Sequence, residues 1–358
     1  MDIPLELAPA QLLAEADSAY RALQLDAALA AYRQAADAYP QSYEAQLGLA
    51  RTLSRMRQRG QALEACDHCV EIDPTRYEAY ATRAMLHFLA DELDDAETCS
   101  RSALERADGE PEPWLTLAQI ACDRRAFPLA DQHIREARLR IEALPPGPER
   151  DESSAMAWHV ETYRHLLADD LEQARQAAQQ VIELEEASPY AAALAYSNLG
   201  ILETRQRHYD QAIDYLERAH ATNPHLHRAA GALGRVLIIR GNYEKAAEVL
   251  AQVLQHPEGE SGESHYAYAA ALAHIGRIGE ATTHYREALS RGLTWPMRIL
   301  ALWHLLWLNR VARAALVALC VLLFLAWVAF GQPSQQAITL VVMIAVLVAL
   351  QKYVFRRR

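Results

Sequence analysis

The chain has 358 residues, and its 51% hydrophobic content with only 14 glycines and 15 prolines favours long helices over a loop-rich sheet protein. The formal net charge is −11 at pH 7. Residues 291–358 contain eight basic and no acidic groups, which leaves 27 basic and 46 acidic groups in residues 1–290. This acidic body excludes non-specific nucleic-acid binding, which needs clustered lysine and arginine to neutralise phosphates.

One set of apolar and small residues recurs after 34 residues in the second half of the chain. The first copy consists of Asn198, Leu199, Gly200, Tyr209, Ala212, Leu216 and Ala219. The second copy, 34 residues later, consists of Ala232, Leu233, Gly234, Tyr243, Ala246, Leu250 and Val253. A period of 34 residues predicts stacked pairs of α-helices, because each pair leaves an apolar face that the next pair must cover.

Followed along the chain, these landmarks resemble the tetratricopeptide repeat family over about four-fifths of its length. That family has a bulky residue at repeat position 4, leucine at 7, small residues at 8, 20 and 27, and proline at 32. Residues 1–143 fit four repeats, with matches such as Ala28, Leu49 and Trp114, and residues 154–294 fit four more. The resemblance implies an all-α superhelical solenoid of about eight helix-turn-helix repeats. Two transmembrane helices are expected to follow it, from the apolar end of the chain.

The repeat register breaks at residues 144–153, which include Pro145, Pro146 and Pro148. Proline removes a backbone donor and clashes with the preceding helical turn, so this segment is predicted to be a loop. It could be a hinge between two sub-arrays or a long loop between stacked repeats. We favour the loop, because apolar helix faces gain by stacking across it.

The end of the chain is strongly apolar. Residues 295–310 are expected to form an amphipathic helix, either the solvating helix that closes such arrays or a helix in the membrane interface. Residues 311–330 and 337–355 are two apolar stretches joined by an uncharged turn at 331–336 and followed by a basic tail at 356–358. They predict a transmembrane hairpin. The alternative is a wedge in one leaflet, because the second stretch is short.

Aromatic and basic side chains flank the apolar stretches and are expected at the membrane interface. These residues are Trp295, Arg298, Trp303, Trp307, Arg310, Arg313, Lys352 and Arg356. Because the turn carries no charge and the N-terminus has no signal-peptide pattern, the positive-inside rule places the repeats and both termini in the cytoplasm. The expected location is a membrane, and the composition suggests the bacterial inner membrane.

Cys66 and Cys69 have the spacing of a metal-binding or redox pair. They nevertheless occupy repeat positions 24 and 27, which are packing positions, and no second pair with zinc-site spacing follows. The sequence has no phosphate-binding loop, nucleophile elbow or HExxH motif. We therefore expect no metal, no cofactor and no catalytic residues, so the chain is predicted not to be an enzyme.

In the family, the first helix of each repeat lines the concave face. In repeats five to seven the matching positions give the candidate peptide-binding residues His159, Tyr163, Asn198, Ile201, Arg205, Arg228 and Arg235. Asn198 and Arg228 match two of the five positions of the carboxylate clamp in chaperone-binding members, whereas His159, Tyr163 and Ala232 depart from it. The three arginines suit a peptide that carries a carboxylate, unless they are ordinary solvated side chains.

These features together predict a membrane-anchored adaptor or scaffold that holds a protein or peptide at the cytoplasmic side of a lipid bilayer. The alternative is a subunit or assembly factor of a membrane complex, in which the hairpin also contacts other transmembrane subunits. Neither hypothesis includes nucleic acid as a partner.

Overall fold

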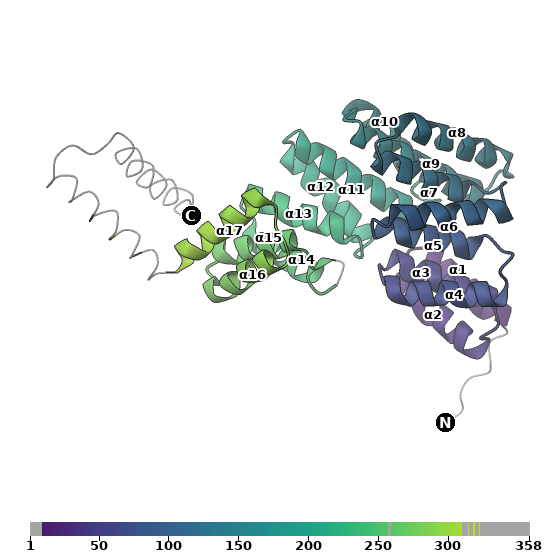
Figure 1. Ribbon diagram of the computed structural model, residues 1–358, viewed down its shortest axis with the longest axis horizontal. Helices are drawn as coiled ribbons and strands as arrows, with labels where there is room; N and C mark the ends of the chain where they lie inside the picture. The colour runs from purple at the N-terminus through teal and green to yellow at the C-terminus, as the bar shows by residue number, and fades with distance from the viewer. Residues whose placement is uncertain (1–8, 257–258, 310–313, 315–317, 319–321, 323–358) are drawn as a thin grey trace, which may run out of the picture. The chain divides into compact units, whose positions relative to one another are not determined.

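The computed structural model describes residues 9–256 and 259–309, together with positions 314, 318 and 322. The regular structure of these residues is helical throughout, and Figure 1 labels the helices in chain order. They form two compact units, which divide between Leu233 and Gly234 within helix α13.

The first unit contains twelve complete helices and the start of a thirteenth. Their bounds are Pro9–Arg21 (α1), Leu25–Ala38 (α2), Tyr43–Arg55 (α3), Arg59–Ile72 (α4), Glu78–Leu89 (α5), Leu93–Arg106 (α6), Pro111–Asp123 (α7), Phe127–Ala143 (α8), Pro148–Leu167 (α9), Leu171–Glu183 (α10), Pro189–Arg205 (α11), Tyr209–Thr222 (α12) and His227–Arg240 (α13). The second unit adds Tyr243–Val253 (α14), Gly262–His274 (α15), Ile278–Ser290 (α16) and Trp295–Leu308 (α17).

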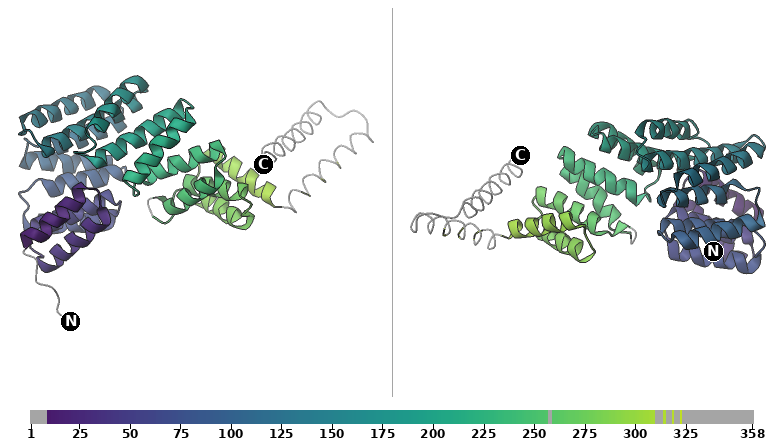
Figure 2. Two further views of the ribbon diagram at one scale, coloured as in Figure 1. Left: turned by 180° about the vertical axis from the view of Figure 1, so that it is seen from behind. Right: turned by 45° about the horizontal axis from the view of Figure 1, so that its top comes forward.

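Successive helices of the first unit pair as hairpins, from α1 with α2 to α11 with α12. Each hairpin also packs on the next, through α2 with α3 and so on to α10 with α11. The odd-numbered helices from α1 to α11 contact one another in series and form one wall of the stack, called the inner wall below. In the second unit, α15 packs on α14 and α16, and α17 packs on α16 (Figures 1 and 2). The predicted all-α solenoid of helix hairpins is confirmed.

Each hairpin turns at one residue in the left-handed backbone region. These residues are Leu23, Arg57, Asp91, Arg125, Asp169 and Arg207 in the first unit, and Gly241 and Gly276 in the second. The residue after each of them donates its amide hydrogen to a carbonyl five positions back, as Gln58 does to Leu53 at 2.9 Å. These bonds satisfy carbonyl groups that the helix end leaves free. Eight such turns occur among the described residues, which equals the number of repeats that the sequence predicts.

The hairpins pack closely because small side chains stand where helices meet. The alanines at repeat positions 8 and 20 of the first four hairpins are fully buried: Ala16, Ala28, Ala50, Ala62, Ala84, Ala96, Ala118 and Ala130. In the sixth hairpin, Gly200 takes the place of alanine, and a Cβ there would lie 2.4 Å from Leu216 Cγ. A larger residue at that position would force the two helices apart.

The predicted loop at residues 144–153 is wrong over its second half. Helix α9 begins at Pro148, so only residues 144–147 separate it from α8. Pro148 stands in the first turn of the helix, where a missing amide hydrogen costs nothing. Gly147 precedes it at φ 156°, a conformation that other residues rarely adopt. Helix α9 packs on both α7 and α8, so the stack continues across the break without a hinge.

The extra residues lengthen the inner-wall helices of two hairpins. The turn residues are 34 apart from Leu23 to Arg125, but the next two intervals, to Asp169 and Arg207, are 44 and 38. Helix α9 has 20 residues and α11 has 17, whereas α7 has 13. The first insertion therefore lengthens α8 and the N-terminal end of α9, and the second lengthens the N-terminal end of α11.

Helix α17 covers the end of the second unit and packs on α16. Its Ala301 is fully buried, and the His304 ring stacks on Tyr285 with the ring centroids 5.2 Å apart. The opposite side of α17 is open, with Trp295 74% and Leu302 57% exposed. This helix occupies the segment predicted to be either solvating or interfacial.

None of the helices in the described ranges is long and apolar enough to cross a membrane. The spans predicted at 311–330 and 337–355, the turn at 331–336 and the tail at 356–358 lie outside the described residues, apart from positions 314, 318 and 322. The same holds for the predicted interface residues Arg310, Arg313, Lys352 and Arg356.

Candidate functional site

Five of the seven residues predicted to bind a peptide lie on two neighbouring helices of the inner wall. His159 and Tyr163 are one turn apart on α9, and Asn198, Ile201 and Arg205 are on α11. Helix α9 packs directly on α11, so the fold brings these five residues into one region.

His159 is a buried residue with an unused polar atom. Its side chain is 7% exposed, and its Nδ1 has no hydrogen-bond partner in the part of the chain that the structure describes. Burial lowers the pKa of His159 to about 4, so the ring is neutral at pH 7. An unsatisfied buried polar group costs about 1–3 kcal/mol, and a ligand that satisfied it would recover part of that cost.

Tyr163 is held by a neighbouring inner-wall helix. Its hydroxyl donates a hydrogen bond to Asp123, the last residue of α7. Burial and this hydrogen bond raise the pKa of Tyr163, while the positive charge of Arg228 acts in the opposite direction. Arg228 is therefore close enough to Tyr163 for its charge to be felt there.

Asn198 and Arg228 both carry donors that the fold leaves unused. The amide nitrogen of Asn198 is buried and has no acceptor among the described residues. Arg228 is exposed near the start of α13 and forms no hydrogen bond or ion pair with another described residue. These are the two positions that match the carboxylate-clamp pattern, and both are available to an acceptor group.

The remaining candidates are less available. Arg205 donates to the carbonyl oxygen of Leu166 at 3.3 Å and lies 3.7 Å from a carboxylate oxygen of Asp169. Ile201 is half-buried and offers an apolar contact. Arg235 is exposed and belongs to the second unit, so it is not a member of the group on α9 and α11.

Sequence reasoning missed one residue of this region, Gln119 on α7. It is 6% exposed, and its Oε1 has no partner within the described ranges. Gln119 stands at position 9 of the fourth repeat, which is a concave-face position in the family, so the repeat register could have identified it. Unused buried polar atoms thus occur on three consecutive inner-wall helices, α7, α9 and α11.

Charged residues on the earlier inner-wall helices are paired within the chain. Arg76 donates to Glu44 and to Glu78 at 2.7 Å each, and Arg51 donates to Glu112 at 3.3 Å. The hydrogen bond from Arg76 lowers the pKa of Glu44. Successive members of these three glutamates stand 34 residues apart. This repeated acidic position was not predicted from the sequence.

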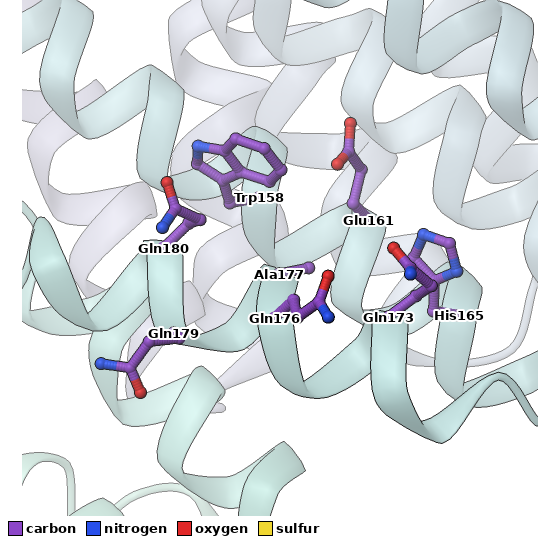
Figure 3. Close-up of a pocket in the computed structure, with 8 residues that line it drawn as sticks. All are labelled: Trp158, Glu161, His165, Gln173, Gln176, Ala177, Gln179 and Gln180. Carbon is purple, nitrogen blue, oxygen red and sulfur yellow. The ribbon is translucent and has the colours of Figure 1, made fainter.

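A cavity of about 450 Å³ lies between α9 and α10, and Figure 3 shows the side chains around it. Its lining residues are Trp158, Glu161, His165, Gln173, Gln176, Ala177, Gln179 and Gln180. Arg138 on α8 covers the Trp158 ring at 3.9 Å and bonds Glu161 at 2.7 Å. The aromatic and acidic groups of this cavity are therefore already engaged by the protein.

Two clusters contain residue types that bind metals. The CxxC pair is buried, and burial raises the pKa of Cys69 to about 12, so its thiol stays protonated and is a poor ligand. The ligand atoms of His87, Glu92 and Asp95 lie within 4.8 Å of one another. Glu92 already contacts His87 at 2.6 Å and also pairs with Arg59, so its carboxylate is engaged within the chain.

Two family models described as tetratricopeptide repeat match the chain. One matches residues 13–76 and 165–227, and the other matches residues 204–261. No curated protein matches it.

Among solved structures, the chain is similar to one from the crystal structure of the APC/C hetero-tetramer Cut9–Hcn1. The TM-score is 0.59 at 16% identity, over 82% of this chain and 55% of that one. The present chain thus spans about half the length of that protein, and at this identity the likeness shows the fold alone. The matched segments and the hairpin stack together show that the chain contains tetratricopeptide repeats.

Proposed function

We propose that the chain is a membrane-anchored adaptor that binds a protein or peptide partner on the inner-wall helices α7, α9 and α11, together with Arg228 at the start of α13. The observation that supports this proposal is the set of unused polar atoms on Gln119, His159 and Asn198, next to the unpaired Arg228. Buried polar groups in native proteins usually have a partner in the protein, in ordered water or in a ligand.

The chemistry of these groups fits an extended segment with a carboxylate. Arg228 and the Asn198 amide can both donate to carboxylate oxygens. The bond from Arg228 is the stronger of the two, because both its donor and its acceptor are charged. His159 and Gln119 can satisfy backbone groups of the same segment, because they offer a ring nitrogen and an amide oxygen. Ile201 adds apolar contact area beside them.

Cross-linking of the full chain in its native membrane tests this proposal. Arg228→Glu should lower the yield of the cross-linked partner at least about tenfold, because it replaces a donor cation with a repelling carboxylate. Arg135→Glu is the matched control, since Arg135 is an exposed residue of α8 without an ion pair among the described residues. Equal yields from the two variants would overturn the inner-wall proposal and favour contact through the predicted hairpin.

Membrane anchoring is supported by the apolar stretches at 311–330 and 337–355 and by the exposed side of α17. Trp295 is 74% exposed, Arg298 is exposed, and the Trp303 and Trp307 rings stack with their centroids 6.0 Å apart. Tryptophan and arginine side chains suit the headgroup region of a bilayer. The proposed topology keeps the repeats and both termini in the cytoplasm, in the inner membrane of a bacterium.

Fractionation of the full chain and of a chain that ends at Asn309 tests the anchor. The full chain should stay in the membrane pellet at alkaline pH, and the shortened chain should be released with its helical far-UV spectrum intact. Protease added to intact cells should spare the repeats. A full chain that is released at alkaline pH, or repeats that are digested in intact cells, would contradict the proposed anchor and topology respectively.

A further inference from the structure

The lengthened helices α9 and α11 reach a residue of α3. Arg55 is the last residue of α3, and its guanidinium donates to Glu152 Oε1 at 3.1 Å, from the second turn of α9. The two residues are 97 positions apart in the chain. The Arg55 side chain is 13% exposed, so this ion pair is more shielded than an ordinary surface pair.

Two tyrosine rings also contact Arg55. Its guanidinium carbon lies 3.9 Å from the centroid of the Tyr20 ring and 4.6 Å from the centroid of the Tyr190 ring. The same group donates to the carbonyl oxygen of Tyr20 at 3.4 Å. Cation–π contacts of this kind strengthen when the cation is shielded from water. The Arg55 guanidinium thus contacts two aromatic rings and one carboxylate.

The insertions in the repeat pattern supply two of these contacts. Glu152 belongs to residues 148–154, which precede the start of the fifth repeat in the 34-residue register, and Tyr190 precedes the start of the sixth. A regular inner-wall helix of 13 residues, such as α7, has no residue at either place. The contact with Arg55 is therefore a specific product of the two insertions.

Residues 148–154, called the strap from here on, have little apolar anchorage. All seven are exposed or half-buried, and the first buried residue of α9 is Ala155. Their sequence, Pro-Glu-Arg-Asp-Glu-Ser-Ser, has no large apolar side chain. Segments with few buried apolar contacts open locally at low free-energy cost. Among the described residues, the Glu152–Arg55 ion pair is the one side-chain hydrogen bond or ion pair that joins the strap to another helix.

We propose that the strap closes the inner wall of the first unit and that it opens when a carboxylate-bearing segment takes the place of Glu152 on Arg55. The proposal rests on the proposed function for the nature of that segment, which would belong to the bound protein or peptide. Glu152 occupies the position on Arg55 that the partner's carboxylate takes when the partner is bound. Binding to the inner wall is then regulated by the chain itself.

Hydrogen exchange in the full chain, with no partner present, tests the strap contact. Glu152→Gln and Arg55→Gln should each raise exchange at residues 151–156 about fivefold, and the double variant should exchange no faster than either single one. Glu149→Gln, on the same strap but without an ion pair among the described residues, should leave exchange unchanged. Equal rates in the Glu149 and Glu152 variants, or additive effects in the double variant, would overturn the contact.

A labelled peptide of residues 148–154 tests whether Arg55 accepts a carboxylate from another chain. The Glu152→Gln variant should bind this peptide at least about tenfold more tightly than the native chain does, because the native strap competes at a high effective concentration. The Arg55→Gln, Glu152→Gln double variant should not bind it. Absence of saturable binding at millimolar peptide, or equal binding to all three proteins, would overturn the exchange step. Neither result depends on Arg228, so failure here is distinct from failure of the proposed partner site.

Discussion

The inner wall satisfies its polar groups differently along its length. On α3, α5 and the start of α7, arginines and glutamates pair with one another, as Arg51 does with Glu112. On α7, α9 and α11, Gln119, His159 and Asn198 keep buried polar atoms without partners in the described structure, beside ion pairs such as that of Arg164 with Asp131. Both regions are built from the same hairpins, so the difference lies in the inner-wall side chains. We propose that the unpaired region provides the main binding surface, and that the paired region stabilises the stack and contributes Arg55 once the strap opens.

The largest expected effect concerns pH. Burial holds the pKa of His159 at about 4, against 6.5 for an ordinary histidine. The unfolded chain binds this proton below pH 6.5 and the folded chain does not, so the stability present above pH 6.5 is lost as pH falls, by about 3 kcal/mol near pH 4.

Urea unfolding of the native chain and of His159→Leu across this pH range measures that contribution. The variant should lose less stability on acidification, and the difference between the two proteins should open between pH 6.5 and pH 4. The paired region behaves differently. The pKa of Glu44 is lowered, so the stability that Glu44 contributes is lost only below 4.5, the ordinary pKa of a glutamate. Parallel pH curves for the two proteins would contradict the buried, neutral state of His159.

Removal of Arg55 should cost more stability than removal of Arg228, because Arg55 has a carboxylate partner and Arg228 has none among the described residues. Arg55→Ala should lower the free energy of unfolding by about 2 kcal/mol, because it leaves Glu152 without its partner and removes contacts with two tyrosine rings. Arg228→Ala should change it by no more than about 0.5 kcal/mol. Urea midpoints with unchanged slopes would measure both. Equal losses would mean that Arg228 has structural contacts of its own.

Asn198→Leu should separate stability from binding in the unpaired region. Replacing a buried amide that has no acceptor by an apolar side chain should leave stability unchanged or raise it by about 1 kcal/mol. The same change should reduce partner capture several-fold, because a donor to the bound segment is lost. Thermal unfolding and cross-linking yield, measured on the same preparations, test the two effects. A marked loss of stability would show that the Asn198 amide is satisfied in solution.

The same hairpin turns occur in both regions, so glycine substitutions at these turns should change the free energy of unfolding in the same direction. Arg57 and Arg207 have positive φ values of 62° and 64°, which glycine adopts more easily than arginine. Arg57→Gly and Arg207→Gly should each stabilise the chain by about 0.5 kcal/mol, after the entropy cost of glycine is included. Gly241→Ala, at φ 80°, should have the opposite sign. Different signs at Arg57 and Arg207 would show that the two regions differ in their scaffold as well.

The sequence predicts the hairpins well because stacking requires small side chains at fixed intervals, and Ala28, Ala62 and Ala96 satisfy that requirement without help from the rest of the chain. It misplaces the start of α9 because proline has two roles. Pro148 begins a helix, while Pro145 and Pro146 keep the preceding residues out of one.

The candidate site is harder to predict from the sequence, because its residues form hydrogen bonds and ion pairs with residues far away in the chain. The register places Arg55 and Arg228 on the first helix of a repeat, without showing that only Arg55 meets a carboxylate. That contact depends on the length of α9, which follows from the misplaced helix start. Arg205 is similar, because its bond to Leu166 becomes visible only when α9 and α11 are packed together.

Site-specific photo-cross-linking in the native membrane tests the central claim most directly. A photoreactive residue at Ile201, on α11 in the unpaired region, should yield a partner adduct that Arg228→Glu removes. The same residue at Leu89, an exposed position on α5 in the paired region, should yield none. An adduct from Leu89 but not from Ile201, or an Ile201 adduct that survives Arg228→Glu, would contradict the assignment of partner binding to the unpaired wall.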